Sequence, residues 1–477
     1  MLCENKMIQT SKLEILIAKL YLYFMPFRMF SQLSLLKSIF GVCANYMPFV
    51  FHVLGMLLWI RNENGKIGFH VSDVGPLLKS MGKTMVYLNL SSCAMSILIQ
   101  LNYGNHGEEN AFSGISGMLV YFAQYFFMFL YNARVFELLD RETINQILHR
   151  VCIILLFIGL FQVAVMNGVG GAIYNKLNIF GNLATNLPKL CLTTDEGSNA
   201  GRVIAIFVFP YLFSQIIQTG KKIYILEVLI WLIPIYYTKS STAYILIAID
   251  VLVFSILLFF SKNSRRTKVE ILLFVLIIFG CALFIMMETG ILEDDITEQI
   301  HYLLFKKATD RSNGSTASRT VPLLINWGAF TEYPFFGIGN GLQGYFYEKY
   351  FPDWAYTVKG SDVGIFLERS KNGIGNGGLF FPSILSGYGI VGCCVIALFV
   401  YKLIRMYLRR KNENGNFRYM FLIAAAAFCV NGFSGDAYGM YWAWLMLSLP
   451  LYDGKKDRLE VAMEKEADYG REMERIV

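Results

Sequence analysis

Long apolar stretches, separated by shorter polar ones, dominate the pattern of this chain. A membrane-spanning helix needs about 20 mainly apolar residues, and windows of that length predict about twelve spans. We therefore expect an all-α integral membrane protein in which residues 1–477 form a single polytopic domain with about 12 transmembrane helices. The predicted spans cover residues 13–30, 38–60, 84–103, 112–132, 151–167, 202–218, 223–238, 242–260, 269–288, 378–401, 419–434 and 437–452.

The polar stretch between the ninth and tenth predicted spans is much longer than the others. It covers residues 289–377, and we expect it to form a large, partly helical extracytoplasmic loop. Two further polar segments are shorter. Residues 136–149 have apolar positions at helical spacing, which predicts a cytoplasmic surface helix between two spans. The charged residues 453–477 predict a cytoplasmic tail.

The distribution of basic residues predicts the orientation of the spans, because Lys and Arg concentrate in cytoplasmic loops. With the N-terminus placed in the cytoplasm, most of the 42 Lys and Arg residues fall in cytoplasmic segments and few fall in the short outer loops. An even number of spans then puts both termini in the cytoplasm and residues 289–377 outside. Because loops commonly carry function on a rigid scaffold, we expect the chemistry on this outer side.

Composition supports the same class of protein and excludes others. The chain is 55% hydrophobic and 16% charged, whereas soluble domains are about 25% charged. The net charge of +7 comes from basic residues at the ends of spans, so we expect no nucleic-acid partner. Its cysteines lack the paired spacing of a disulfide framework or a metal site, and no nucleotide-binding motif occurs, so we expect no cofactor and no metal.

Two acidic residues lie inside predicted spans. Asp250 is in the middle of one span, and Glu227 lies in another. A mid-span aspartate costs about 2.5–3.5 kcal/mol on insertion scales, so it should face the bundle interior and have a partner. Asp250 therefore belongs either to a site or proton path, or to a hydrogen bond between helices.

Four basic residues are predicted near the outer membrane surface, namely Arg202, Lys239, Arg311 and Arg319. The guanidinium group binds phosphate in a fork geometry and keeps its charge at any working pH. These side chains would suit an anionic lipid head group such as a pyrophosphate. The alternative is that they are scattered surface charges that contact ordinary phospholipids.

The segment RTVPLLINWGAFTEYPFFGIGNG, residues 319–341, combines an arginine with a tryptophan, a proline and a G-x-G pattern. In this order they resemble the signature of the O-antigen polymerase and O-antigen ligase family (Wzy/WaaL-type proteins). The segments GRVIAIFVFP (201–210) and TKSSTAY (238–244) resemble its upstream motifs, and SGYGIVG (386–392) resembles the span that follows. Ligases commonly carry a histidine late in the long loop. This chain has none after His301, which favours the polymerase branch.

The resemblance implies an enzyme of the bacterial plasma (inner) membrane that joins undecaprenyl-pyrophosphate-linked oligosaccharide repeat units into O-antigen, capsule or exopolysaccharide. The lipid-linked glycan is both donor and acceptor, the bilayer surrounds the protein, and a flippase and a chain-length regulator are expected partners in the pathway. One alternative is a ligase that transfers the glycan to another acceptor. Another is a flippase or exporter, although such transporters usually show internal repeats and lack a long outer loop.

The resemblance also implies roles for individual residues. The expected catalytic residues are Arg319, Arg202 and Arg311, which would stabilise the departing pyrophosphate without a metal. The expected substrate-binding residues are Lys239, Trp327, Gly337, Gly339 and Gly341. The glycines are expected to shape a turn, and contact between their amides and a phosphate is the alternative. No general base stands out, and the candidates in the long loop are His301, Glu332, Glu348, Asp362 and Glu368.

Overall fold

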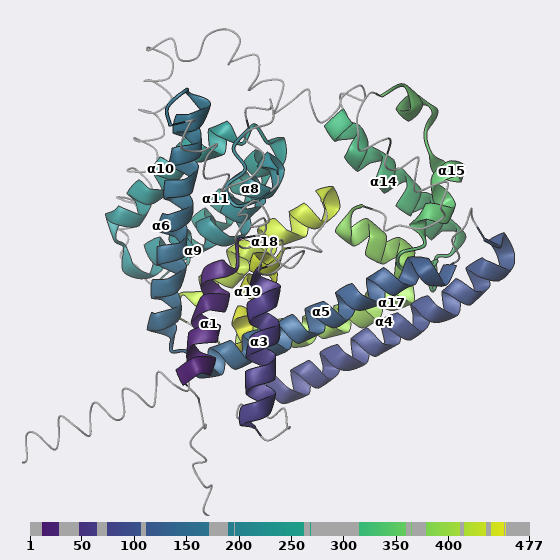
Figure 1. The fold of residues 1–477 in the computed structure, drawn as a ribbon, viewed down its shortest axis with the longest axis horizontal. Helices are drawn as coiled ribbons and strands as arrows, with labels where there is room; N and C mark the ends of the chain where they lie inside the picture. The colour runs from purple at the N-terminus through teal and green to yellow at the C-terminus, as the bar shows by residue number, and fades with distance from the viewer. Residues whose placement is uncertain are drawn as a thin grey trace, which may run out of the picture.

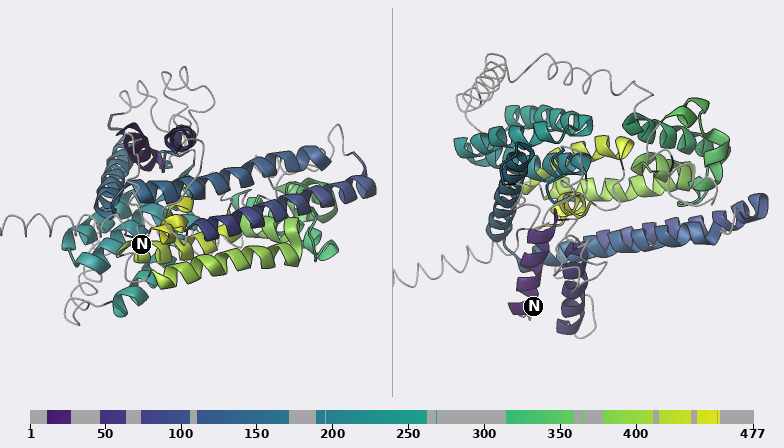
Figure 2. Two further views of the ribbon diagram at one scale, coloured as in Figure 1. Left: turned by 90° about the horizontal axis from the view of Figure 1, so that it is seen from below. Right: turned by 45° about the horizontal axis from the view of Figure 1, so that its top comes forward.

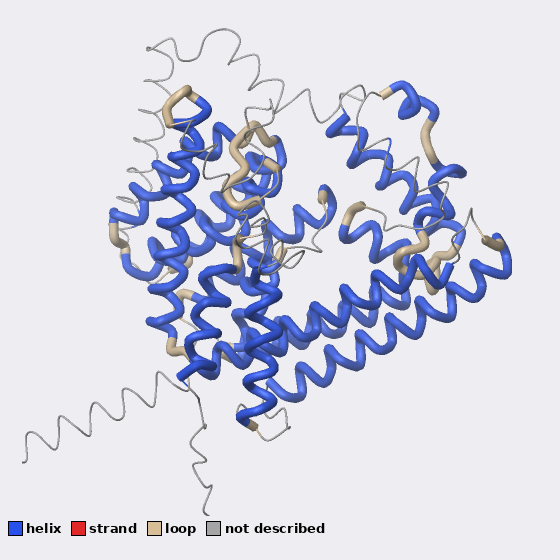
Figure 3. Tube along the Cα trace, in the orientation of Figure 1, coloured by secondary structure: helices blue, strands red, loops and turns tan. Residues whose placement is uncertain are grey.

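The computed structural model describes residues 12–27, 47–63, 74–105, 111–170, 189–194, 196–261, 268, 314–358, 364, 378–410, 415–435, 440–452 and 454. Within these ranges all regular secondary structure is helical (Figures 1 and 3). The α-helices are α1 (Lys12–Phe24), α3 (Met47–Asn62), α4 (Val74–Tyr103), α5 (Ala111–Leu138), α6 (Arg141–Met166), α8 (Gly197–Val203), α9 (Phe209–Thr219), α10 (Lys222–Tyr237), α11 (Ser241–Phe259), α14 (Gly314–Glu332), α15 (Tyr347–Tyr350), α17 (Phe380–Arg409), α18 (Phe417–Ser434) and α19 (Tyr441–Ser448). The short helices are the π turn η2 (Ile204–Val208) and the 3₁₀ turns η4 (Gln343–Phe346), η5 (Asp353–Thr357) and η6 (Leu449–Leu451).

In the described part of the chain, 6 helices are long and apolar enough to cross a membrane, as a multi-pass membrane protein requires. They are α4, α6, α11, α17, α18 and the continuous helix Gly197–Thr219, which consists of α8, η2 and α9. Large apolar side chains on their outward faces are exposed, among them Leu90, Leu101 and Phe157. The predicted span at 269–288 lies outside the described residues.

The helix from α8 to α9 is buried on all sides. A helix that is apolar all round belongs in the interior of a bundle. Gly201 allows α8 to pack closely on α11, because a Cβ at this position would overlap that of Ala243. Directly after Arg202 and Val203 the helix widens into the π turn η2, a feature that occurs frequently at functional sites.

The connection between α5 and α6 differs from its prediction. Residues 136–149 do not form a separate surface helix, because α5 continues to Leu138 and α6 begins at Arg141. Asp140 starts α6 by accepting hydrogen bonds from the amide and the hydroxyl of Thr143, each at 2.7 Å. This N-cap satisfies amides that have no partner in the first helical turn, and it therefore fixes the boundary.

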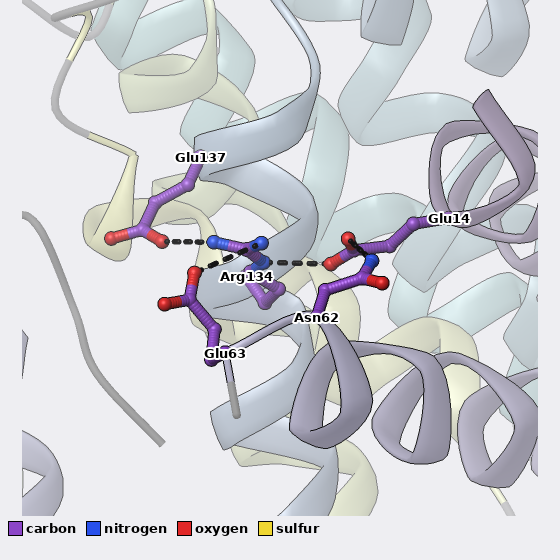
Figure 4. Close-up of polar contacts among 5 residues, drawn as sticks. All are labelled: Glu14, Asn62, Glu63, Arg134 and Glu137. Atoms are coloured by element: carbon purple, nitrogen blue, oxygen red, sulfur yellow. Dashed lines mark hydrogen bonds and ion pairs between the residues drawn. The ribbon is translucent and has the colours of Figure 1, made fainter. Parts of the chain in front are cut away.

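A buried arginine joins the ends of α1, α3 and α5 (Figure 4). Arg134 Nε donates to Glu14 Oε1 at 2.9 Å, and its Nη1 and Nη2 lie 3.3 Å and 3.6 Å from Glu137 and Glu63. Asn62 Nδ2 donates to the second oxygen of Glu14 at 2.6 Å. Arg134 and Glu14 are fully buried. Because a buried charge must be paired, this cluster holds the three helix ends together.

Helix ends predicted to share one side of the membrane lie together in the structure. The Arg134 cluster joins ends that were all predicted to be cytoplasmic. At the other side, the Thr193 hydroxyl donates to the Pro26 carbonyl at 2.7 Å, and the Leu190 amide donates to the Tyr237 carbonyl at 2.8 Å. These four residues belong to segments predicted to share the outer side.

The two acidic residues inside spans differ in their surroundings. Glu227 Oε1 lies 3.0 Å from His149 Nε2, so this carboxylate has a partner in the first half of α6. Asp250 is fully buried in α11, and neither of its carboxyl oxygens has a hydrogen-bond partner among the described residues. Glu227 therefore has a partner, whereas the described contacts provide none for Asp250, for which a partner was expected.

Beside the Arg134 cluster, the bundle extends into a layer of long helices. There, α4 lies between α5 and α17, and the three helices run side by side (Figure 2). The helix α14 packs against α17 as well. The part of the predicted long loop that forms α14 is therefore attached to one of the helices that are long and apolar enough to cross a membrane.

Candidate functional site

The buried side chain of Arg202 lies in α8 and is held by two asparagines. Its Nε donates to Asn431 Oδ1 at 2.9 Å, and its Nη1 donates to Asn199 Oδ1 at 2.6 Å. Asn199 precedes Arg202 on the same helix face, whereas Asn431 lies near the end of α18. The guanidinium also lies against Gly435, where any Cβ would overlap it. Both asparagine side chains are neutral, so they orient the guanidinium without cancelling its charge.

Arg319 approaches the same helix from α14, where its side chain is half-buried. Burial lowers the pKa of this guanidinium, and the negative charge of Glu196 acts in the opposite direction. Glu196 immediately precedes α8, and its side chain makes no capping hydrogen bond there. Arg319 is therefore within electrostatic range of the residue that precedes the helix carrying Arg202.

The turn between α10 and α11 brings Lys239 to this end of the bundle. Lys239 has a left-handed backbone conformation, with a φ of 48°. The carbonyl of Thr238 lies against Gly197, where a Cβ would come within 2.5 Å of it. Ser240 then caps α11 by accepting a hydrogen bond from the Ala243 amide at 3.4 Å. The turn thus packs against the start of α8.

Three of the four cations predicted at the outer surface therefore relate to the start of α8: Arg202 lies in it, the turn that carries Lys239 packs against it, and Arg319 is within electrostatic range of Glu196 before it. We refer to Arg202, Lys239 and Arg319 as the cation group. The first two residues of α11, Ser241 and Thr242, have buried hydroxyls without a hydrogen-bond partner in the described part of the chain. Fixed cations next to polar groups, within a largely apolar bundle, can bind an anion strongly. Arg311, the fourth predicted cation, lies outside the described residues.

The three predicted substrate-binding glycines form turns, and their amides are used within the protein. Gly337, Gly339 and Gly341 have φ values of 71°, 91° and 98°, a backbone region in which glycine carries no steric penalty. Their amides donate at 2.9–3.0 Å to the carbonyls of Tyr333 and Gly387 and to a glutamine side chain. A phosphate would have to displace these bonds. The geometry thus supports the turn-forming role and disfavours the alternative in which these amides contact a phosphate.

Glu332 connects α14 to the segment that follows it. Its Oε1 accepts hydrogen bonds from Lys349 Nζ at 2.7 Å and from the Tyr350 hydroxyl, and its Oε2 lies 3.4 Å from the Tyr103 hydroxyl. Burial raises the pKa of Glu332, but the hydrogen bonds from Lys349 and Tyr350 outweigh burial, and the pKa falls below its ordinary value. A carboxylate with a lowered pKa and several donors is a poor general base. The geometry therefore favours a structural role.

Trp327 lies on the outward face of α14. Its side chain is 57% exposed, and its ring lies 5.6 Å from that of Phe330. The preceding residue, Asn326, is buried, and its Oδ1 accepts a hydrogen bond from Ser386 Oγ at 2.5 Å. The helix thus has a polar contact with α17 on one side and an exposed aromatic residue on the other.

Of the remaining candidates for a general base, only Glu348 is among the residues that the structure describes. Glu348 is exposed in α15, and no described contact joins it to the start of α8. The other candidates, His301, Asp362 and Glu368, lie outside the described residues.

Sequence reasoning missed three residues that shape this site. Asn199 was detectable, because a polar residue three positions before Arg202 shares its helix face. Glu196 was also detectable as an acidic residue at a helix start, where the helix dipole favours it. Asn431 carried no local signal, because its contact with Arg202 bridges a separation of 229 residues.

Comparison with known proteins leaves the family open. No family model matches this chain, and neither does any curated protein. The resemblance described above rests on the motifs themselves.

Proposed function

We propose that this protein is a polymerase that joins undecaprenyl-pyrophosphate-linked oligosaccharide repeat units into a surface polysaccharide. In this proposal it resides in the bacterial plasma membrane with about twelve spans, both termini are cytoplasmic, and the reaction occurs at the outer face. The observation that carries the proposal is the cation group. Arg202 lies in a buried helix start, the turn that carries Lys239 packs against that start, and Arg319 from a third segment is within electrostatic range of Glu196 beside it.

The proposed reaction suits such a site. A hydroxyl of one lipid-linked unit attacks the anomeric carbon of another, a new glycosidic C–O bond forms, and the pyrophosphate leaves with the electron pair of the broken C–O bond. The enzyme needs to align the two glycans and to stabilise negative charge on the leaving group. Arg202 is oriented in advance by Asn199 and Asn431, so little reorganisation is needed when this charge develops.

The attacking hydroxyl must also lose a proton. Glu332 is disfavoured as the acceptor, because its pKa is lowered and its oxygens are already hydrogen-bonded. The proposal therefore keeps His301, Asp362 and Glu368 as candidates for the general base.

A reconstituted system tests the cation group directly. Purified protein in lipid vesicles receives undecaprenyl-pyrophosphate-linked repeat units, and electrophoresis then resolves the glycan ladder. We expect Arg319→Ala to abolish extension and Arg202→Lys to slow it about tenfold or more, since a hydrogen bond to a charged group contributes about 1.5–3 kcal/mol. Arg150→Lys is the matched control. Arg150 is an exposed arginine in a segment predicted to be cytoplasmic, and it donates a hydrogen bond to the Tyr23 hydroxyl. Normal ladders from Arg319→Ala would remove this residue from the site.

A deletion strain separates the proposed polymerase from its alternatives. Loss of a polymerase leaves single repeat units on the outer leaflet. Loss of a flippase leaves them on the inner leaflet, and loss of a ligase leaves long chains attached to the lipid carrier. Either of the last two outcomes would overturn the proposal.

A further inference from the structure

The chain that follows α14 runs alongside an interruption in α17. Gly389, with φ of 62° and ψ of −167°, breaks the helix, so nearby amides and carbonyls lose their usual helical partners. Backbone hydrogen bonds of 2.8–3.0 Å from the segment after α14 replace some of them. With the donor first, these bonds run from Ile338 to Ser386, from Gly339 to Gly387, from Ile390 to Pro334 and from Val391 to Phe335.

The interruption lies deep in a membrane-crossing helix. Gly389 separates α17 into two helical parts, and the part after it contains no charged residue before Lys402. At about 1.5 Å per residue, the break is about 20 Å from Lys402. The hydrocarbon core of a bilayer is about 30 Å thick. The segment bonded to this break is therefore well inside the membrane.

A second helix places the segment at the same depth. The Asn340 amide donates to Ser92 Oγ at 3.3 Å. Ser92 lies about midway along the uncharged part of α4, which extends from Thr84 to Tyr103. Because α4 and α17 are separate spans, the two depth estimates are independent of each other.

The chain reaches the membrane surface both before and after this point. Before it, Glu332 lies 3.4 Å from the hydroxyl of Tyr103, at the end of α4. After it, the Tyr345 hydroxyl donates to the Gly104 carbonyl at 3.4 Å, beside the same helix end. The segment thus descends after Glu332 and has returned by Tyr345.

The polar side chains of the segment are suited to such a depth. Irregular backbone within a membrane occurs only where the protein covers it. Gln343 is fully buried, and its Nε2 lies 3.2 Å from Ser386 Oγ, which in turn donates to Asn326. The hydrogen-bonding groups therefore face α17 and not the lipid.

The outward face of the segment is apolar and uncovered. Phe335 and Phe336 are 65% and 53% exposed, although the backbone beside them is at mid-membrane depth. Leu323, Leu324 and Trp327 continue the exposed surface along α14. Exposed apolar area costs about 25 cal/mol per Å² in water, whereas contact with hydrocarbon removes this cost.

We propose that residues 333–344 form a re-entrant membrane segment whose apolar face contacts the hydrocarbon of the outer leaflet. This inference goes beyond the proposed function and does not depend on it. It changes the predicted extracytoplasmic loop, because the chain that follows α14 is inserted between the outer surface and the membrane centre. Arg319 then lies at the edge of a lipid-facing surface, so a lipid-linked molecule can approach it sideways within the membrane.

Spin labels on single cysteines, placed in the full chain without its native cysteines, test the insertion in lipid vesicles. Power saturation measures collisions of each label with oxygen, which dissolves in lipid, and with nickel(II) ethylenediaminediacetate, which stays in water. The labelled variants are Phe335→Cys and Phe336→Cys, with Leu324→Cys as a further site if either folds poorly. Leu90→Cys is the lipid-facing control, since Leu90 is 65% exposed in α4. The water-facing control is Glu348→Cys.

We expect the labels at 335 and 336 to match the Leu90→Cys control, with oxygen collisions several-fold more frequent than those of the Glu348→Cys control. Nickel collisions as frequent as those of Glu348→Cys would show that the segment is in water and would overturn the proposal. Low collision frequencies with both reagents would overturn it as well, because a second copy or another protein segment would then cover this face.

Discussion

Replacing Gly389 with alanine tests whether the fold depends on the interruption of α17. A Cβ at Gly389 would come within 2.6 Å of the Gly337 amide nitrogen and would overlap the Phe335 carbonyl. The next two amides, those of Ile390 and Val391, donate to carbonyls of the segment after α14 at 2.8 Å and 3.0 Å. Alanine therefore has to push two bonded segments apart.

The expected loss of stability has two parts. The φ and ψ of Gly389 lie in a region that is essentially restricted to glycine, and other residues there lose about 1–3 kcal/mol. Separating the segments weakens two backbone hydrogen bonds, each with a net contribution of about 1 kcal/mol. We therefore expect Gly389→Ala to lower the free energy of unfolding by about 3–5 kcal/mol.

Unfolding of the purified protein in detergent micelles, followed by circular dichroism, measures this loss. Gly75→Ala is the control, because a Cβ at Gly75 in α4 meets nothing within 4 Å. The control is expected to change the free energy of unfolding by about 1 kcal/mol or less. Equal effects of the two substitutions, or full stability of Gly389→Ala, would refute the reasoning about the interruption.

Three further predictions concern the charged residues. Arg134→Ala removes the charge partner of the buried Glu14 and should lower the free energy of unfolding in detergent by about 3–5 kcal/mol. Adding Glu14→Leu should restore part of that loss. A double variant as unstable as the single one would contradict this. Asn431→Asp places a carboxylate on the Arg202 guanidinium, so glycan extension should fall while the unfolding midpoint changes little, and undiminished extension would argue against an anion-binding role. The folded-state pKa of Glu332 lies below its ordinary value of 4.5, so its stabilisation is fully present above that value and is lost as the pH falls through the folded-state pKa. The difference in melting temperature between wild type and Glu332→Gln should therefore shrink on acidification from pH 7, and a constant difference would count against this ion pair.

Local pattern was sufficient to predict most of the described helices. The spans predicted at 202–218 and 242–260 coincide with Gly197–Thr219 and α11, because a long apolar stretch in lipid must satisfy its backbone internally. The prediction was wrong at 136–149, where hydrophobic spacing continues across a real boundary. There, Asp140 caps the start of α6 and so separates α6 from α5, although the hydrophobic spacing continues through this point.

The candidate site was predictable only in part. Arg202, Lys239 and Arg319 were identified by residue type and motif, because guanidinium and ammonium groups near a membrane surface suit an anionic head group. Their assembly around α8 was not predictable from spacing. The role of Gly337, Gly339 and Gly341 also required the structure, because only tertiary contacts reveal that their amides are already hydrogen-bonded.

The amino-acid sequence alone determined that this is a helical, multi-pass membrane protein, and it identified the residue types that can bind an anion. Both follow from local chemistry, since apolar runs and basic side chains act wherever they occur. The tertiary structure decided which of them meet, as when Asn431 holds Arg202 across 229 residues. It also decided that the glycine-rich segment pairs with the broken α17. These outcomes depend on hydrogen bonds between distant segments, which no local pattern encodes.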